Sequence, residues 1–406
     1  MIKKLLVCFG IFACFITYAQ STDNWLATLQ RPDGEKIVFN FIIENANNKH
    51  VLYVINASEK IKVDNIRFTA DSVFISMPVF ESVIKAAIKN NEWQGTWTKG
   101  GTITEHVMAF SATLSPKRFS ANAGNALFNV TGRWAVSFEG DKTAPYPSVA
   151  EFKQTGNKLT GTILTPTGDY RYLEGIVTGN QIKLSTFDGG HAFLFTATII
   201  NNKIISNGQF YSGKTFKESW HAVKNAKAKV NSSAAAMAMK LGEEKLNFTF
   251  PDLEGKPVSI NDEQFKNKVV IVQIMGSWCP NCMDETAFLS EYYNKNKQRG
   301  VEVISLAYEY STDFERSVKS VKKFQQRFNV QYPMLITGVS VSDSLRTEKT
   351  LPQVTPIKFF PSSIIIDKKG IVRKFDTGFV GPGTGKHFEE YTKGFYALMN
   401  ELLAEN

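Results

Sequence analysis

A pair of cysteines, Cys279 and Cys282, lies between an apolar stretch at residues 269–275 and a segment with apolar residues at helical spacing, residues 288–293. Two thiols separated by two residues at the start of a helix can close a small disulfide ring and reopen it. The free N–H groups and positive dipole end of such a helix favour the thiolate form of the first cysteine. The pattern therefore predicts a buried strand, a redox-active dithiol and a helix, in that order.

Two other roles for this pair have less support. A structural disulfide across so short a loop would add little stability. A zinc site would need a full tetrahedral set of ligands. The remaining cysteines, Cys8 and Cys14, lie in the N-terminal apolar segment, and the five histidines show no ligand-like pairing. We therefore expect no metal here, and the pattern favours thiol–disulfide exchange.

Residues 1–19 have the pattern of a cleavable export signal. Lys3 and Lys4 precede an apolar core, and a small-residue end follows it. The apolar run is too short to span a bilayer comfortably. The sequence thus predicts a signal peptide and a periplasmic location. A retained membrane anchor, or a lipoprotein anchored through Cys14, is the alternative.

Length and charge narrow the classes of function. A chain of 406 residues is expected to form two or more domains. Its 47 Lys and Arg exceed its 38 Asp and Glu, but they are spread without a long basic block or basic–aromatic interleaving. Nucleic acid is therefore not an expected partner.

Residues 20–224 contain short alternating stretches separated by turn signals, which predicts an all-β antiparallel sandwich or barrel-like region. A weak repeat suggests two related halves, because Trp25 and Trp134 open the halves and Trp97 and Trp220 lie near their ends. The segment 77–91 is read as a helix or a loop. His191 follows a Gly-rich turn, where we expect an exposed, structural or solvated side chain.

The rest of the chain has a different periodicity. Residues 225–242 are rich in Ala, Lys and Ser and are predicted to be a linker. Residues 243–406 alternate strands with amphipathic helices, which predicts an α/β domain with a mixed sheet flanked by helices.

This C-terminal region resembles the thioredoxin superfamily, and within it the exported TlpA/ResA-like thiol–disulfide oxidoreductases. The resemblance rests on Trp278 to Cys282, on Glu285, and on Phe360-Pro361-Ser362-Ser363. It implies that Pro361 is cis and lies beside the cysteines, where the Phe360 backbone and Trp278 contact an extended peptide substrate. The bulky Phe360 departs from the smaller residue that the family often has there.

The predicted chemistry assigns each cysteine a step. Cys279, at the exposed helix start, attacks a substrate disulfide, and Cys282 resolves the mixed disulfide. By resemblance, Glu285 influences proton movement and thiol acidity.

The family favours a reductase of disulfide-containing exported proteins, although the sequence does not fix the direction. Because no nicotinamide or flavin motif occurs, we expect no cofactor, and electrons would come from a membrane dithiol donor. Two alternatives stay open: a peroxiredoxin-like peroxidase, whose usual motif is missing before Cys279, and a redox-sensing binding protein whose β-domain binds a ligand or partner.

Overall fold

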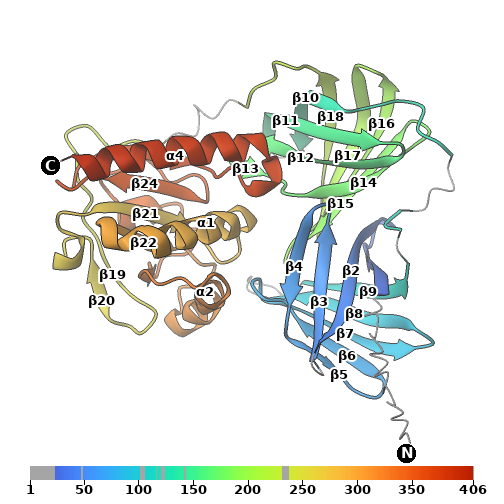
Figure 1. The fold of residues 1–406 in the computed structure, drawn as a ribbon, viewed down its shortest axis with the longest axis horizontal. Coiled ribbons are helices and arrows are strands. Elements are labelled where there is room, and N and C mark those ends of the chain that lie inside the picture. Colours follow the sequence, from blue (N-terminus) through green and yellow to red (C-terminus); the bar gives the residue numbers. More distant parts are fainter. Residues whose placement is uncertain are drawn as a thin grey trace, which may run out of the picture.

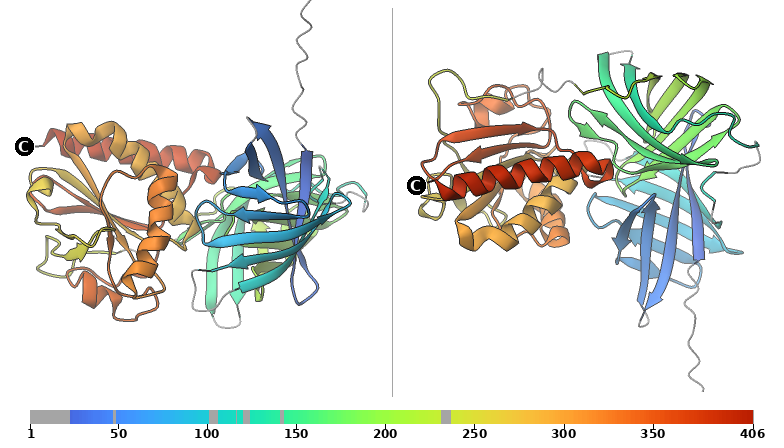
Figure 2. Two further views of the ribbon diagram at one scale, coloured as in Figure 1. Left: turned by 90° about the horizontal axis from the view of Figure 1, so that it is seen from below. Right: turned by 45° about the horizontal axis from the view of Figure 1, so that its top comes forward.

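The computed structural model describes residues 23–46, 49–100, 106–115, 117–119, 124–140, 143–230 and 237–405. The predicted signal at residues 1–19 lies outside these ranges. A β-region (23–224) and a C-terminal α/β domain stand side by side (Figures 1 and 2). Among the described residues, no helix has the length and apolar character needed to cross a bilayer.

The first half of the β-region is one antiparallel sheet in the order β4-β3-β2-β1-β9-β8-β7-β6-β5. Alternate side chains point into its core, as the strict in-and-out burial pattern of β6 shows. Trp25 and Trp97 are both buried in this core. Its strands are β1 (Asp23–Gln30), β2 (Lys36–Ala46), β3 (Lys49–Asn56), β4 (Glu59–Val63), β5 (Ile66–Phe68), β6 (Ser72–Ser76), β7 (Ser82–Lys89), β8 (Glu92–Lys99) and β9 (His106–Leu114).

The second half is a closed ring of antiparallel strands. The order β11-β10-β18-β17-β16-β15-β14-β12-β13 is closed by an additional pairing of β11 with β12. Trp134 and Trp220 are buried inside it. Its strands are β10 (Gly132–Gly140), β11 (Thr143–Thr155), β12 (Lys158–Thr165), β13 (Gly168–Asp169), β14 (Leu173–Thr178), β15 (Gln181–Phe187), β16 (Ala192–Asn201), β17 (Ile204–Ser212) and β18 (Phe216–Lys224).

The two sheets share much of their strand order. When each is numbered from its own first strand, both contain the run 2-1-9-8-7-6-5. The segments that suggested a repeat, around Val73 and Ile182, fall in β6 and β15, the sixth strand of each set. The two halves thus share this part of their strand order, while only the second sheet has the additional closing pair among the described strands.

Two local expectations in the β-region are wrong. The segment 77–91 is largely strand β7, which pairs with β6 and β8, so cross-strand contacts decide its conformation. His191 is largely buried, with its side chain 15% exposed, because it packs against Phe80 and pairs with Asp188.

The C-terminal domain has a five-stranded mixed sheet in the order β23-β22-β21-β24-β25, with the first three strands parallel. Side chains of α1, α2 and α4 share one hydrophobic cluster with one sheet face, while the segment around Leu246 to Val258 and residues 351–357 cover the other. The elements are β19 (Thr249–Pro251), β20 (Pro257–Ser259), β21 (Val269–Met275), α1 (Pro280–Asn296), β22 (Val301–Ala307), α2 (Phe314–Phe328), β23 (Met334–Ile336), α3 (Arg346–Thr350), β24 (Ser362–Ile366), β25 (Val372–Thr377) and α4 (Lys386–Ala404), with 3₁₀ turns at Glu263–Phe265, Lys297–Arg299 and Pro382–Thr384.

The described ends of the predicted linker pack onto the two parts of the protein. The carbonyl of Ala228 accepts a hydrogen bond from Arg133 Nε at 2.7 Å. Met237 is buried, and Met239 forms a bridge with Val354. The linker is thus anchored on both sides.

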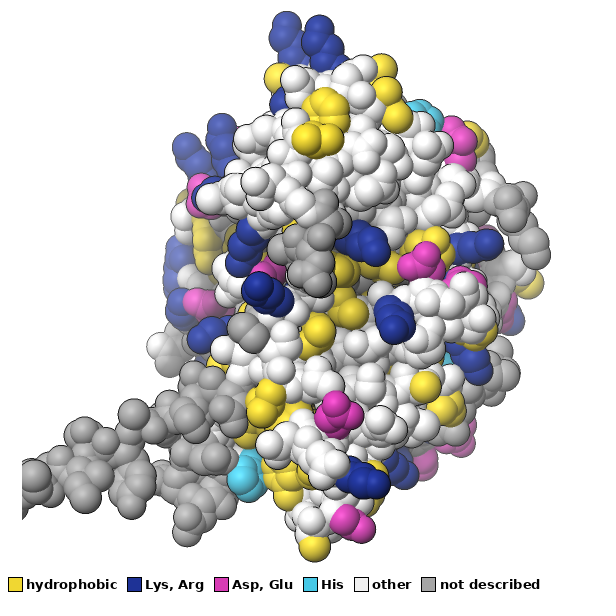
Figure 3. Space-filling model, turned by 90° about the vertical axis from the view of Figure 1, so that its right-hand side faces the viewer, with side chains coloured by type: hydrophobic (Ala, Val, Ile, Leu, Met, Phe, Trp, Pro, Cys, Tyr) yellow, Lys and Arg dark blue, Asp and Glu magenta, His cyan; other side chains and the backbone are white. Residues whose placement is uncertain are grey.

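The face of the β-region turned away from the C-terminal domain carries mixed charges (Figure 3). Lys and Arg side chains are distributed over this face among acidic and apolar ones, rather than gathered in one stretch. The surface seen here is in keeping with the dispersed charge of the sequence.

Candidate redox site

The cysteine pair lies where the sequence predicts it, after β21 and at the start of α1, with Cys279 at the N-cap and Cys282 in the first turn. All residues of β21 are buried, and this central strand delivers the chain to the start of the helix. Cys279 and Cys282 form a disulfide, with their Cα atoms 5.2 Å apart. The Cys282 N–H donates to Cys279 Sγ at 3.1 Å, so the first sulfur caps the helix. This contact also stabilises negative charge on that sulfur when the disulfide is open.

The second sequence motif meets the pair in space. The Phe360–Pro361 peptide bond is cis, as predicted, and the Phe360 carbonyl oxygen lies 3.6 Å from Cys279 Sγ. Trp278 Nε1 donates to the Tyr308 carbonyl at 2.9 Å, and its ring packs against Phe360 with centroids 5.4 Å apart. The Phe360 backbone therefore lies at Cys279, and Trp278 packs on the Phe360 ring.

Both sulfur-bearing side chains are covered. Cys279 is 3% exposed and Cys282 is fully buried, so the expectation of an exposed Cys279 is wrong for this arrangement. The β-region takes part in this burial, since Val79 and Phe80 belong to the same buried hydrophobic cluster as the two cysteines. Sequence periodicity carries no signal for a contact of this kind between distant segments.

Glu285 is buried beneath the helix rather than solvated on its surface. Its carboxylate accepts hydrogen bonds from Gln273 Nε2 at 2.9 Å and from Ser363 Oγ at 2.8 Å. Burial raises the pKa of Glu285 to about 7, although these two donors lower it in part. A carboxyl group with this pKa can hold or release a proton near neutral pH.

A charge cluster around the buried Arg171, which the sequence did not reveal, joins the β-region to α1. Arg171, 5% exposed, forms ion pairs with Glu59 of β4 and with Asp284, two residues after Cys282. Burial alone would lower the pKa of Arg171, but Asp284 and Glu59 outweigh it and raise that pKa. The guanidinium therefore stays charged and ties both parts of the protein together.

The residues between the two cysteines also touch the β-region. The Asn281 carboxamide, oriented by its partners, donates to the Asp169 carbonyl and accepts from the Asp169 N–H, both at 3.1 Å. Asp169 Oδ2 in turn accepts from the Gly381 N–H at 2.8 Å. These bonds fix the start of α1 against β13.

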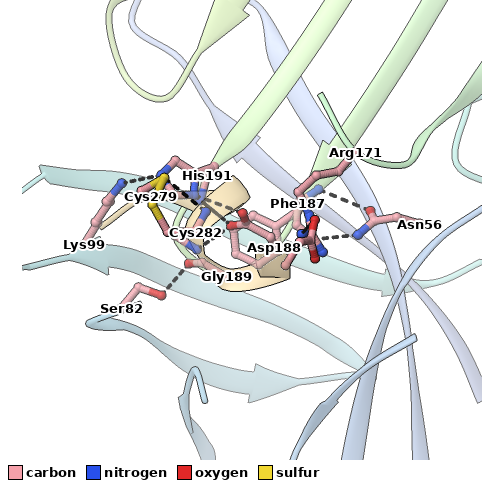
Figure 4. Close-up of polar contacts among 12 residues, drawn as sticks. Asn56, Ser82, Lys99, Arg171, Phe187, Asp188, Gly189, His191, Cys279 and Cys282 are labelled. Atoms are coloured by element: carbon pink, nitrogen blue, oxygen red, sulfur yellow. Dashed lines mark hydrogen bonds and ion pairs between the residues drawn. A yellow bond between two sulfur atoms is a disulfide. The ribbon is translucent and has the colours of Figure 1, made fainter. Parts of the chain in front are cut away.

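Asp188, His191 and Lys99 form a polar cluster in the β-region, and the His191 ring packs against Phe80 (Figure 4). His191 Nδ1 lies 2.9 Å from Asp188 Oδ2, and Lys99 Nζ lies 3.3 Å from His191 Nε2. Burial lowers the pKa of His191, which favours the neutral ring. Ser82 and Trp97 both donate to the Gly189 carbonyl, so the turn between β15 and β16 is held against β7 and β8.

A cavity of about 450 Å³ opens beside the redox helix. The β-region contributes the aromatic side chains of Tyr146, Tyr170 and Phe193 to its wall. The C-terminal domain contributes Pro280, Asn281 and Phe359. Pro280 and Asn281 are the residues between the cysteines. A molecule or side chain in this cavity would contact the two residues between the cysteines.

Known proteins resemble the C-terminal part of the chain. Residues 240–391 match the family model described as Redoxin. Thiol-disulfide oxidoreductase ResA of Bacillus thuringiensis subsp. konkukian is 32% identical over 155 residues, which cover 38% of this chain and 78% of the relative. The protein of the same name from Geobacillus thermodenitrificans is 28% identical over 143 residues, or 35% of this chain and 71% of the relative.

Among solved structures, a thioredoxin family thiol:disulfide interchange protein from Chlorobium tepidum aligns with 41% of this chain and 100% of its own, at 19% identity and a TM-score of 0.31. The site geometry, the mixed sheet and the ResA relatives agree on the chemistry. The chain is a thiol–disulfide oxidoreductase that belongs, through its C-terminal domain, to the ResA family.

Proposed function

We propose that the protein is an exported reductase that opens disulfides in periplasmic protein substrates through a Cys279/Cys282 dithiol–disulfide cycle. The observation that carries this proposal is the Cys279–Cys282 disulfide at the start of α1, next to the Phe360–Pro361 cis peptide. The ResA relatives are named thiol–disulfide oxidoreductases. This name favours substrates that are proteins with cysteines.

The cycle starts from the dithiol. The Cys279 thiolate attacks one sulfur of the substrate disulfide, forms a new S–S bond, and releases the other substrate sulfur as a thiolate. Cys282 loses its proton and attacks Cys279 Sγ, which frees the second substrate thiolate. The substrate gains two electrons and two protons in all, and Cys279 and Cys282 are left as the disulfide.

Proton transfer is the proposed role of Glu285. Its carboxyl lies one helical turn after Cys282 and has a pKa of about 7, so it can exchange a proton with the thiols at neutral pH. Gln273 and Ser363 hold it in place. Trp278 and the Phe360 backbone are proposed to contact the substrate chain.

A membrane dithiol is the proposed source of electrons for the next cycle. It would reduce the Cys279–Cys282 disulfide by the same exchange chemistry in reverse. Export follows from the signal pattern at residues 1–19.

Insulin reduction tests the proposal. The full mature chain with dithiothreitol should precipitate insulin faster than dithiothreitol alone, and Cys279→Ser should abolish the gain. Cys282→Ala should instead trap a mixed disulfide on Cys279 that non-reducing electrophoresis detects. Equal insulin reduction by wild type and Cys279→Ser would rule the reductase out.

The cavity beside Pro280 favours a second candidate, a redox-sensing binding protein. Its aromatic wall, Tyr146, Tyr170 and Phe193, suits an apolar ligand. Such a protein would reduce insulin little, and its ligand affinity would differ between the dithiol and disulfide forms. Titration of both forms with an aromatic probe separates the two functions.

A further inference from the structure

The segment Met77–Glu81 crosses from the β-region to the redox site. It connects β6 to β7, and Met77 stays in the core of the first sheet. Val79 and Phe80, 4% and 3% exposed, instead join the hydrophobic cluster of the C-terminal domain, together with Cys279, Cys282 and Met283. Both ends of the segment therefore continue into strands of the first sheet, while Val79, Phe80 and Glu81 contact the C-terminal domain.

Phe80 is held on two sides. Its ring lies edge-on to Phe324 of α2, with centroids 6.4 Å apart, and edge-on to His191, at 4.7 Å. A Cβ at Gly190 would come within 2.4 Å of the Phe80 ring, so the absence of a side chain at 190 makes room for it. The position is shaped for an aromatic side chain.

Glu81 adds a charge contact to α2. Arg316 Nη1 donates to Glu81 Oε1 at 2.6 Å, the other guanidinium nitrogen pairs with Oε2, and Ser320 Oγ donates to Oε1 at 2.9 Å. Burial alone would raise the pKa of Glu81, but the bonds from Arg316 and Ser320 outweigh it and lower that pKa. A bidentate pair of this kind recognises a carboxylate specifically.

A protein disulfide must reach Cys279 Sγ, yet Cys279 is 3% exposed and shares its hydrophobic cluster with Val79 and Phe80. We propose that Val79-Phe80-Glu81 occupies the surface on which protein substrates dock, and acts as an intramolecular competitor for them. The surface then selects substrates that present an apolar aromatic residue followed by a carboxylate. This inference rests on the proposed reductase function and specifies its substrate class.

The rate of thiol alkylation at Cys279 measures how often the segment Val79-Phe80-Glu81, called the cover below, moves away from the cysteines. If the cover must open before a reagent reaches Cys279, the rate scales with the open fraction. After reduction, full-length Phe80→Ala and Glu81→Gln should react with iodoacetamide at Cys279 roughly tenfold faster than wild type, because each loses contacts that hold the segment. Mass spectrometry of the Cys279 peptide gives the rate.

A matched control is Glu151→Gln. Glu151 contacts His387 of α4 at 2.9 Å, so it also joins the β-region to the C-terminal domain, but away from the cover. Its alkylation rate should equal that of wild type. Equal acceleration in Glu151→Gln and Glu81→Gln would overturn the proposal, since the effect would then be general loosening.

A charge exchange keeps the test independent of misfolding. Glu81→Arg alone should speed alkylation, and addition of Arg316→Glu should slow it again by restoring the pair in reverse. Circular dichroism checks that each variant is folded. Acceleration that the second change does not reverse, or no acceleration at all in folded variants, contradicts the cover.

Substrate class is tested with a peptide. A blocked peptide of residues 77–82 should slow alkylation of the Phe80→Ala variant severalfold, and a scrambled peptide should not. No protection by the first peptide, or equal protection by both, overturns the assigned preference. These measurements do not require turnover, so loss of insulin reduction in the wild type would refute the reductase and leave the result on the cover intact.

Discussion

Gly168 of β13 and Asn281 in the first turn of α1 approach so closely that a Cβ on residue 168 would lie 1.7 Å from the nearest Asn281 side-chain atom. Gly168 has a φ of +154°, which side chains rarely tolerate. Asn281 uses this closeness to bond to both backbone groups of Asp169. The β-region therefore touches the residues between the two cysteines directly.

Gly168→Ala should destabilise the protein more than a glycine change without a close neighbour. Gly156→Ala is the matched control, because Gly156 also has a positive φ, +58°, but no atom within 4 Å of its added Cβ. We expect about 1 kcal/mol of destabilisation from Gly156→Ala and a larger loss from Gly168→Ala. Urea denaturation of the two variants measures both; equal losses would contradict the contact.

Glu285→Gln should change how stability depends on pH. Because the folded pKa is about 7 against an ordinary 4.5, the folded carboxyl keeps a proton between these values while the unfolded carboxyl loses it. Glu285 therefore stabilises the fold less as pH rises through this window, by about 3 kcal/mol in all. Relative to wild type, Glu285→Gln should gain roughly that amount between pH 4 and pH 8. Parallel stability curves for the two proteins would show that the pKa is not raised.

Ser363→Ala should raise the pKa of Glu285 further. Ser363 Oγ donates to the carboxylate at 2.8 Å, which favours the ionised form. The control is Ser362→Ala, since Ser362 Oγ donates to the Phe359 carbonyl at 3.0 Å instead. Carboxyl NMR with labelled glutamate gives both pKa values. An unchanged pKa in Ser363→Ala would mean that the serine does not stabilise the charge.

Arg171→Ala should cost about 3–5 kcal/mol, because it leaves the partly buried Asp284 and Glu59 without their cation. Denaturation at pH 7 measures the loss. Lys62→Ala removes an exposed ion pair with Asp64, and the free energy of unfolding should stay the same within the error of the measurement. Similar behaviour of the two variants would show that the buried cluster contributes no more than a surface pair.

Local signals were enough for the redox loop and its domain. A wholly apolar strand, a cysteine pair and a helix with one apolar stripe are adjacent in sequence, so their order predicts β21, the disulfide and α1. The family resemblance placed Phe360 and the cis Pro361 beside them.

Contacts between distant segments were beyond sequence reasoning. Strand β7, with Ala, Lys and Ile, has residues that also suit a helix, and only its neighbours β6 and β8 make it a strand. The ion pair of Arg171 with Asp284 and the shared cluster of Phe80 with Cys279 depend on how the β-region packs against the C-terminal domain. The periodicity of apolar residues within each part does not predict how the two parts pack against each other.

The placement of Val79 and Phe80 bears on how the C-terminal domain behaves when it is produced alone. A fragment that starts near residue 237 would lack Phe80, whose ring packs on Phe324, and Val79, which belongs to the same buried cluster. Apolar area exposed by this loss favours self-association. Reaction rates measured on such a fragment would describe an enzyme that lacks the Val79-Phe80-Glu81 segment.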